Sequence, residues 1–515
     1  MTTMKASFRL ILASLLAALL LGGCTASIPV RQDSAPDLPA PSLAFAAPVG
    51  DTGESEAQTV LLCLPATHSG RLTLFPERVL LSHARHPAEY ALRRLFSYSG
   101  TTQAGPLISG TQLSLNPGTS IEVSNGTATV NLAPSALSLS NQERYFVSQA
   151  IARTLTQWGD IHAVNLLINN RHPGLDTAAT IPLGSLAGEA EGDAAGLWDT
   201  ASRANPGTGA AYSSMATLYF PVSAGRGIIA EARPITAKDR SLESMALALV
   251  EALSVRPANL ANTLDMPDLG TLLAGTPVVE ETAGSTGRVI RLAFHEGLNE
   301  TLIAAGIPRS VMMASLTYTL TTFLPYTAGI TVTIGSELVT ALVPAGLYEG
   351  AGEQILFDQG VMQRSQFSHF LLDNCALYFA GPQGNLVKTL RPIPYYQAYN
   401  PRYLVNQLME GPQGTDSIQG LSPVMPEGSR DADLLGIVRQ SDTVLVNLTG
   451  NILSLSADMD ERQERLMVYG MVNTLTQQRG ARQVCFFADG LQNKSFAEQI
   501  ELAGVFYRNE GIIQH

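Results

Sequence analysis

The feature that most constrains the fold of this chain is an internal repeat. The tripeptide Thr-Leu-Thr occurs three times, beginning at Thr154, Thr319 and Thr474, so the copies lie 165 and then 155 residues apart. Each copy has the same position relative to an apolar hairpin, an amphipathic stretch and two further strand-like runs. Ordered recurrence at a nearly constant period indicates duplicated structural units. The chain is therefore expected to fold as tandem modules of one kind.

Each unit begins with a predicted β-hairpin. Its first strand is a short apolar run, and the second and third copies of this run share Leu-Tyr-Phe, at 218–220 and 377–379. A glycine-containing turn follows, and then an extended segment with an arginine, at Arg78, Arg233 and Arg391. Two extended runs joined by such a turn are typical of a hairpin.

An amphipathic helix follows each hairpin, with apolar side chains spaced three or four residues apart. The helical stripes lie within 92–96, 242–253 and 404–408. Such a stripe has to cover a sheet or another helix. In the third unit, Glu410-Gly411-Pro412 predicts the end of the helix, because glycine tolerates a left-handed backbone and proline cannot continue the helix.

The remainder of each unit is predicted as a strand, a helix containing Thr-Leu-Thr and a final strand. The first of these strands alternates apolar and polar residues, at 128–132, 288–292 and 443–448. Alternation predicts one buried face and one solvent face. The fold class is therefore α+β, with three tandem small domains, each a mixed or antiparallel sheet with two helices on one face.

These patterns divide the chain into eight parts. They are a signal peptide (1–23), a flexible tether (24–58), a first domain (59–172), a linker (173–215), a second domain (216–339), a connector (340–374), a third domain (375–490) and a C-terminal tail (491–515). The tether and the linker are rich in small, polar and acidic residues without apolar periodicity, which is typical of flexible segments.

The first residues have the pattern of a bacterial lipoprotein signal peptide. Lys5 and Arg9 precede an apolar run over 10–21, and Leu21-Gly22-Gly23-Cys24 resembles a lipobox. An apolar run of this length is too short to remain as a comfortable membrane span. We therefore expect cleavage before Cys24, diacylation of that cysteine and a body anchored at the extracytoplasmic face of the membrane. The alternative is an uncleaved N-terminal anchor, which also places the rest of the chain outside.

Charge and cysteine content narrow the function classes. The formal charge is −12, which disfavours nucleic acid and anionic lipid surfaces as partners. Cys63, Cys375 and Cys485 each lie in an apolar run, and buried thiols are the first interpretation. A Cys375–Cys485 disulfide is the alternative.

No motif indicates catalysis. The pair His83 and His86 has no carboxylate or cysteine at metal-ligand spacing, and no G-x-S-x-G, P-loop or zincin motif occurs. We therefore predict no catalytic residue, no metal and no cofactor. The recurring arginines are the one repeated polar feature. They are interpreted either as partner contacts through the planar guanidinium or as caps for local carbonyl groups and acidic neighbours.

The motifs of the third unit resemble the GerMN domain of sporulation and germination lipoproteins. The resemblance rests on Leu377-Tyr378-Phe379, Arg391, Glu410-Gly411-Pro412 and Val446-Asn447-Leu448, and it extends to all three units. It implies a lipid-anchored envelope protein with a fold similar to the ring-building domains of secretion and sporulation complexes, and it implies no catalytic residues. Two copies are usual in the sporulation protein, so three are a departure.

The predicted function is a non-enzymatic envelope adaptor or scaffold linked to sporulation or spore germination. Its expected partners are the membrane through Cys24, envelope or sporulation proteins, peptidoglycan, or further copies of itself. The alternative is a peptidoglycan-remodelling enzyme or a cell-wall-binding protein.

Overall fold

The computed structural model describes residues 45–51, 56–81, 86–118, 121–175, 180–188, 209–222, 227–257, 263–281, 287–344, 353–414, 419–477, 480–492 and 495–514. Ala46–His515 form one compact unit. The predicted signal peptide, Cys24 and the Gly- and Ala-rich centre of the predicted linker lie outside the described residues.

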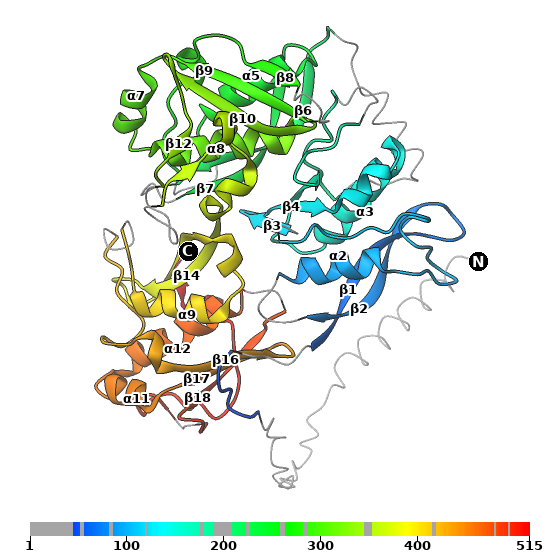
Figure 1. Ribbon diagram of the computed structural model, residues 1–515. Coiled ribbons are helices and arrows are strands. Elements are labelled where there is room, and N and C mark those ends of the chain that lie inside the picture. Colours follow the sequence, from blue (N-terminus) through cyan, green and yellow to red (C-terminus); the bar gives the residue numbers. More distant parts are fainter. Residues whose placement is uncertain are drawn as a thin grey trace, which may run out of the picture. The chain divides into compact units, whose positions relative to one another are not determined.

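The same order of elements occurs three times along this unit, and we name the three copies the first, second and third repeats (Figure 1). The first contains β1 (Glu56–Pro65), β2 (Leu72–Leu81), α2 (Pro87–Phe96), β3 (Ile121–Ser124), β4 (Thr127–Leu132), α3 (Asn141–Leu155) and β5 (Ala163–Ile168). The second contains β6 (Tyr212–Pro221), β7 (Ile228–Ala237), α5 (Leu242–Leu253), β8 (Val278–Glu281), β9 (Arg288–Phe294), α7 (Leu298–Ala304), α8 (Arg309–Phe323) and β10 (Thr327–Ile334). The third contains β14 (Leu372–Ala380), β15 (Leu386–Pro394), α9 (Pro401–Glu410), β16 (Leu434–Gln440), β17 (Thr443–Leu448), α11 (Gly450–Ser456), α12 (Glu461–Leu475) and β18 (Gln483–Ala488).

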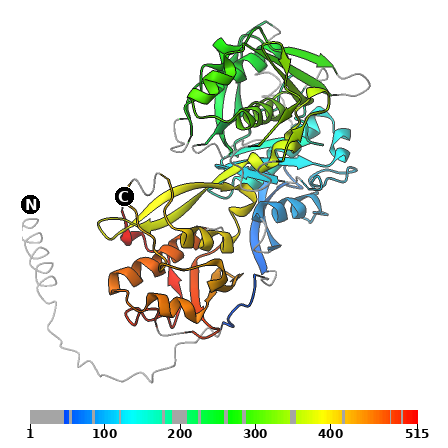
Figure 2. The ribbon, with the colours of Figure 1, turned by 60° about the vertical axis from the view of Figure 1, so that its left-hand side comes forward.

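Each repeat combines an antiparallel hairpin with a separate mixed sheet. The hairpins are β1–β2, β6–β7 and β14–β15, and Figure 2 shows the last as a long pair of strands in yellow. In the mixed sheets the central strand pairs antiparallel with the strand before it and parallel with the strand after the long helix, as in β3-β4-β5. The two helices pack against each other and against the hairpin, as α2 and α3 do in the first repeat. The chain is therefore α+β, and the three predicted hairpins are confirmed.

Local sequence explains where the long helices begin and end. Ser140 and Glu143 form a capping box at the start of α3, and Asp460 and Gln463 form one at the start of α12. These side chains satisfy backbone N–H groups that lack partners in the first turn. Gly411 follows α9 with a φ of 76°, so the predicted helix end is confirmed.

Each repeat has its own hydrophobic core, lined by the predicted stripes. Leu92, Leu249 and Leu404, one from each stripe, are completely buried. The predicted connector does more than join two domains. Its residues Phe357, Met362 and Phe367, among others, belong to the core of the second repeat, and it forms β12 (Ala341–Leu342), β13 (Ile355–Leu356) and the 3-10 helix η4 (Arg364–Phe370).

The prediction that each central strand has one solvent-exposed face is wrong for two of the three strands. All six residues of β4 and all six of β17 are buried, whereas β9 alternates over most of its length. The polar face of β4 is covered by the second repeat, where the Thr129 and Tyr219 hydroxyls lie 3.3 Å apart. On β17, the Asn447 side chain donates to the carbonyl of Pro48 at 2.9 Å.

Both ends of the described chain are built into the third repeat rather than hanging free of it. Within the predicted tether, Gly50 forms a parallel bridge with Gly436 of β16. The predicted tail contributes β19 (Phe506–Tyr507), which pairs with β18, and β20 (Ile513–Gln514), which pairs with β15. These segments therefore complete sheets, which their short and irregular sequences did not indicate.

Candidate functional site at the junction of the repeats

The turn between β3 and β4 connects the first repeat to the other two. The Ser124 hydroxyl donates to the carbonyl of Leu372 at 2.5 Å and accepts from the backbone N–H of Ala230 at 3.0 Å. The Asn125 side chain donates to the carbonyl of Ala230 at 3.0 Å. Asn125 and Gly126 both have positive φ, 45° and 73°, which is the hairpin geometry that an Asn-Gly pair favours.

A buried ion pair lies beside this turn. The guanidinium of Arg364 donates to the carboxylate of Glu122, and the two side chains are 6% and 7% exposed. Arg364 also lies over the ring of Tyr318, 3.8 Å from its centre, and Tyr318 donates to Glu122 at 3.3 Å. Burial alone would lower the pKa of Arg364, but the attraction of the Glu122 carboxylate raises it, so the guanidinium stays charged.

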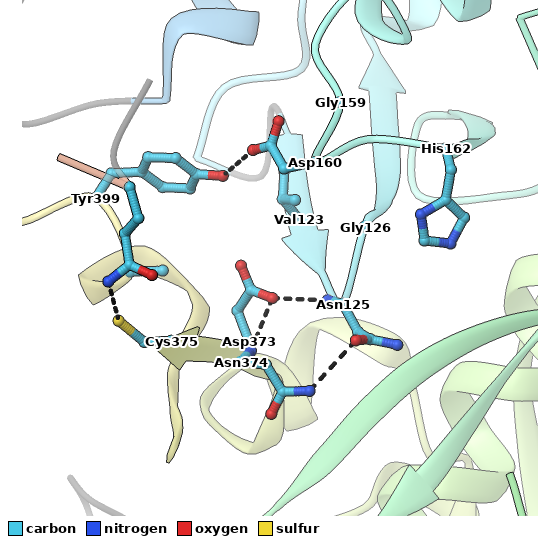
Figure 3. A pocket seen from close by; sticks show the side chains of 12 residues that line it. Val123, Asn125, Gly126, Gly159, Asp160, His162, Asp373, Asn374, Cys375 and Tyr399 are labelled. Carbon is cyan, nitrogen blue, oxygen red and sulfur yellow. Dashed lines mark hydrogen bonds between the residues drawn. The ribbon is translucent and has the colours of Figure 1, made fainter. Parts of the chain in front are cut away.

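A cavity of about 320 Å³ lies between the first and third repeats (Figure 3). It contains the carboxylate of Asp373, which is 7% exposed. One carboxylate oxygen of Asp373 accepts from the backbone N–H of Asn125 at 2.7 Å and from that of Asn374 at 2.8 Å. Burial raises the pKa of Asp373 to about 7, although these two hydrogen bonds oppose the shift.

The other walls of the cavity are polar and aromatic. The Tyr399 hydroxyl donates to Asp160 at 3.1 Å, and its ring meets the ring of His86 edge-on at 4.1 Å. Cys375 also lines the cavity, but burial raises the pKa of its thiol, so the thiol remains protonated at neutral pH. A protonated, buried thiol is a poor nucleophile. The arrangement is suited to binding and to joining repeats rather than to thiol chemistry.

Two of the three predicted arginines cap helix ends within their own repeats. Arg233 donates to the carbonyl of Val255 at 2.8 Å, beyond the end of α5, and Arg391 donates to the carbonyl of Gly411 at 2.8 Å, beyond the end of α9. Their guanidinium groups also lie over the rings of Phe220 and Phe379. These contacts correspond to the capping interpretation for both residues.

The predicted equivalence of Arg78 is wrong by one residue. Gln157 and Gln477 bind the carbonyls of Leu61 and Ala376, which makes these two strand positions equivalent. Counting back one residue in each strand gives Val60 and Cys375, whose hairpin partners are Glu77 and Arg391. Glu77 therefore occupies the position in the first repeat that Arg391 occupies in the third. Its carboxylate binds Arg94 of α2 at 2.8 Å.

Arg78, the next residue along the strand, is exposed. Successive residues of a strand face opposite sides, so a one-residue offset places this side chain on the other face of β2. In the first repeat the hairpin and the helix are thus joined by an ion pair, with an acid on the strand and an arginine on the helix, instead of by a strand arginine that binds carbonyls at the helix end.

The three cysteines of the described residues are buried and unpaired in disulfides, as the first interpretation stated. Within the same residues there is no group of three or more His, Cys, Asp or Glu side chains that could hold a metal ion. Across the described part of the chain, no helix has both the length and the apolar character needed to cross a membrane.

Sequence reasoning did not find the residues of the junction. Asn125-Gly126 was the one available signal, since this dipeptide is a strong hairpin marker. The local sequence around the other junction residues carries no recognisable motif, and only the fold brings them together. These residues are Glu122, Arg364 and Asp373.

Comparison with known proteins finds one family model that matches two regions of the chain. A model of the Germane family, described as sporulation and spore germination, matches residues 67–172 and 376–494. No curated protein matches the chain. Among solved structures, the tandem GerMN domains of the sporulation protein GerM from Bacillus subtilis are 16% identical, with a TM-score of 0.23, over 59% of this chain and 99% of that chain. A Clostridium perfringens protein provisionally described as a lipoprotein is 21% identical, with a TM-score of 0.19, over 26% of this chain and 87% of that chain.

The matched residues coincide with most of the first and third repeats. The second repeat lies between them and has the same order of hairpin, helix, strand, helix and strand. The first and third repeats therefore each match the Germane, or GerMN-domain, family, which is described as sporulation and spore germination.

Proposed function

We propose that this protein is a non-enzymatic envelope adaptor that acts in sporulation or spore germination and is held at the extracytoplasmic face of the membrane by a lipid on Cys24. The family match supports the process, and the lipobox-like sequence before Cys24 supports the anchor. Lipidation with two acyl chains would give stable attachment to the membrane.

The buried pair of Glu122 and Arg364 carries the adaptor part of the proposal. A buried ion pair contributes little net stability compared with apolar packing, but its geometry is demanding. Here it joins the first repeat to the connector, while the Arg364 guanidinium lies over two tyrosines of the second repeat. Charged groups of the junction are thus used to hold repeats together, which suits a scaffold that presents several modules in a defined arrangement.

Repeated modules on one anchored chain favour multivalent binding. Anchoring keeps the modules at the membrane, close to other envelope components, so the protein has less volume to diffuse through before it meets a partner. Modest affinities of the single modules can then combine into a higher overall affinity. The proposed partners are envelope or sporulation proteins, peptidoglycan, or further copies of this chain.

The test is a crosslinking pulldown of the lipidated protein from its native cells during growth and during sporulation. We expect a specific set of envelope proteins that is lost with Cys24→Ala, because this variant removes the anchor and leaves the described residues unchanged. Recovery of no envelope component from either culture would refute the adaptor function.

The second candidate is peptidoglycan remodelling, which the two carboxylates in one cavity, Asp160 and Asp373, make worth testing. The detergent-solubilised full-length protein is incubated with purified peptidoglycan, and soluble fragments are measured. Turnover that disappears with both Asp160→Asn and Asp373→Asn would establish the enzyme and overturn the non-enzymatic assignment.

A further inference from the structure

Only one of the two carboxylate oxygens of Asp373 accepts hydrogen bonds from the described residues. One oxygen accepts two backbone N–H groups, from Asn125 and Asn374. Figure 3 shows the second oxygen pointing away from Asn125, toward the open centre of the cavity, and no hydrogen bond to it occurs among the described residues. The side chain is 7% exposed, so these two hydrogen bonds compensate only part of the cost of burying its charge.

The cavity has the character of a cation site. Two carboxylates line it, from Asp160 and Asp373, and none of its described lining residues is a lysine or an arginine. Its volume of about 320 Å³ is enough for a small organic molecule. Val123, Ala398 and the ring of Tyr399 add apolar surface beside the acids.

We propose that this cavity binds a small organic ammonium ion whose charged nitrogen donates to the free oxygen of Asp373 and whose short aliphatic stem lies against Val123 and Ala398. An ammonium group supplies the opposite charge and hydrogen-bond donors in one compact head. The apolar wall favours an alkylammonium over a hydrated inorganic ion, which would gain nothing from Val123 and Ala398. This binding site is separate from the adaptor function and does not depend on it.

Binding in this cavity would reach two repeats at once. Asp373 belongs to β14 of the third repeat, while Val123 and Asn125 belong to the first. A ligand that neutralises Asp373 stabilises the charged form of the group that accepts the N–H of Asn125. Occupancy is therefore expected to strengthen the contact between these two repeats.

The site should respond to pH near neutrality. Burial raises the pKa of Asp373 to about 7, so the carboxylate that attracts the ammonium is present above this pH and is lost below it. The other titratable groups that face the cavity are Asp160, His162, Tyr399 and Cys375. Burial raises the pKa of the Tyr399 hydroxyl and of the Cys375 thiol, so both stay neutral across this range.

The test is calorimetric titration of the detergent-solubilised full-length protein with butylammonium chloride at pH 8 and at pH 5.5. Butan-1-ol serves as the neutral probe of equal stem length, and sodium chloride at matched concentration serves as the inorganic cation. We expect saturable binding of one butylammonium per chain at pH 8, with a dissociation constant of about 1 mM or below. We also expect affinity to fall about tenfold or more at pH 5.5, and no saturable binding of butan-1-ol.

Variants separate the cavity from the rest of the surface. Asp373→Asn keeps the size of the side chain and removes its charge, so the affinity should fall about tenfold or more. Ala398→Phe should weaken binding by filling the apolar wall without changing Asp373. Glu300→Gln, at an exposed position of α7, is the matched control and should bind as the unchanged protein does.

The proposal is overturned if butylammonium shows no saturable heat, if butan-1-ol binds equally well, if sodium competes at equal concentration, or if Asp373→Asn keeps full affinity. Circular dichroism checks that each variant is folded. Should Asp373→Asn fail to fold, the pH dependence of the unchanged protein decides, because binding that is equal at pH 5.5 and pH 8 also overturns the proposal.

Discussion

Glu122 and Arg364 are 242 positions apart in the chain, yet they form an ion pair that is almost completely buried. Replacing Glu122 with Gln leaves the guanidinium buried without a counter-charge, and we expect a loss of about 3–5 kcal/mol in the free energy of unfolding. Glu122→Gln combined with Arg364→Met removes both charges and should cost less than the sum of the two single changes.

Urea unfolding of the four proteins in this double-mutant cycle measures the coupling. Additive losses, with no coupling between the two positions, would contradict the direct ion pair. Intrinsic fluorescence and circular dichroism should be followed together, because a protein of several repeats need not unfold in one step.

Asp373 should make the stability of the protein depend on pH in an unusual direction for an acid. Its pKa is raised from 3.8 to about 7 in the folded protein, so the folded state holds the proton more tightly than the unfolded state does. Stability from this group is therefore complete below pH 3.8 and is lost as the pH rises to about 7, by at most about 4 kcal/mol. Thermal unfolding without added amine should show that Asp373→Asn gains stability relative to the unchanged protein between pH 4 and pH 8. A constant difference over this range would contradict the raised pKa.

Glu464 of α12 should make the stability of the protein depend on pH in the direction opposite to Asp373. Its buried carboxylate accepts four backbone N–H groups, from Phe496, Ala497, Gln499 and Ile500, at 2.8–3.0 Å. Burial by itself would raise the pKa of Glu464, but the hydrogen bonds from Ser495 and from these backbone groups outweigh it and lower the pKa. Its contribution is present above pH 4.5, the ordinary value, and is lost as the pH falls through the lowered folded pKa.

Replacing Glu464 with Gln is expected to cost about 3 kcal/mol, because an amide cannot serve all of these donors as a charged acceptor. The effect should concentrate in the C-terminal segment that these donors belong to. Hydrogen exchange over 495–500 should accelerate, while exchange in the first repeat stays unchanged. Equal acceleration in both places would show that Glu464 does not act locally.

Arg391 and Arg78 offer a matched pair of substitutions. Arg391→Met retains apolar contact with Phe379 but loses the hydrogen bonds to the carbonyls of Gln407 and Gly411, and should cost about 2–3 kcal/mol. Arg78→Met removes an exposed side chain and should change stability by no more than about 0.5 kcal/mol. Thermal unfolding midpoints compare the two, and similar losses would contradict the one-residue offset between the arginines.

Local sequence predicted the elements of each repeat well, because hairpins and amphipathic helices are governed by nearby residues. The stripe ending at Leu408 and the stop at Gly411 are examples: the first lies on α9, and the second directly follows its last residue. The Arg78 error has a physical origin as well. Equivalent strand positions in different repeats are identified by tertiary contacts such as that of Gln157 with Leu61, which join residues 96 positions apart and leave no mark in the spacing of the strand itself.

The junction could not be predicted either, because its contacts join residues of different repeats that are far apart in the chain. The alternating pattern of β4 is normally that of a half-exposed strand, but Thr129 is buried where Tyr219 of another repeat lies against it. Asp373 is polar and ends in a buried site because it accepts the backbone N–H of a turn 248 positions away.

The bridge between Gly50 and Gly436 also decides how the molecule would bear mechanical load. The backbone N–H of Gly50 donates to the carbonyl of Leu435, the N–H of Ile437 donates to the carbonyl of Gly50, and Arg402 binds Asp51. In a protein tethered at Cys24, a pull from the membrane would reach these bonds on the third repeat before it reached β1. The last repeat, rather than the first, would take up the tension, and the first would stay unstrained until the strand pairing at Gly436 gave way.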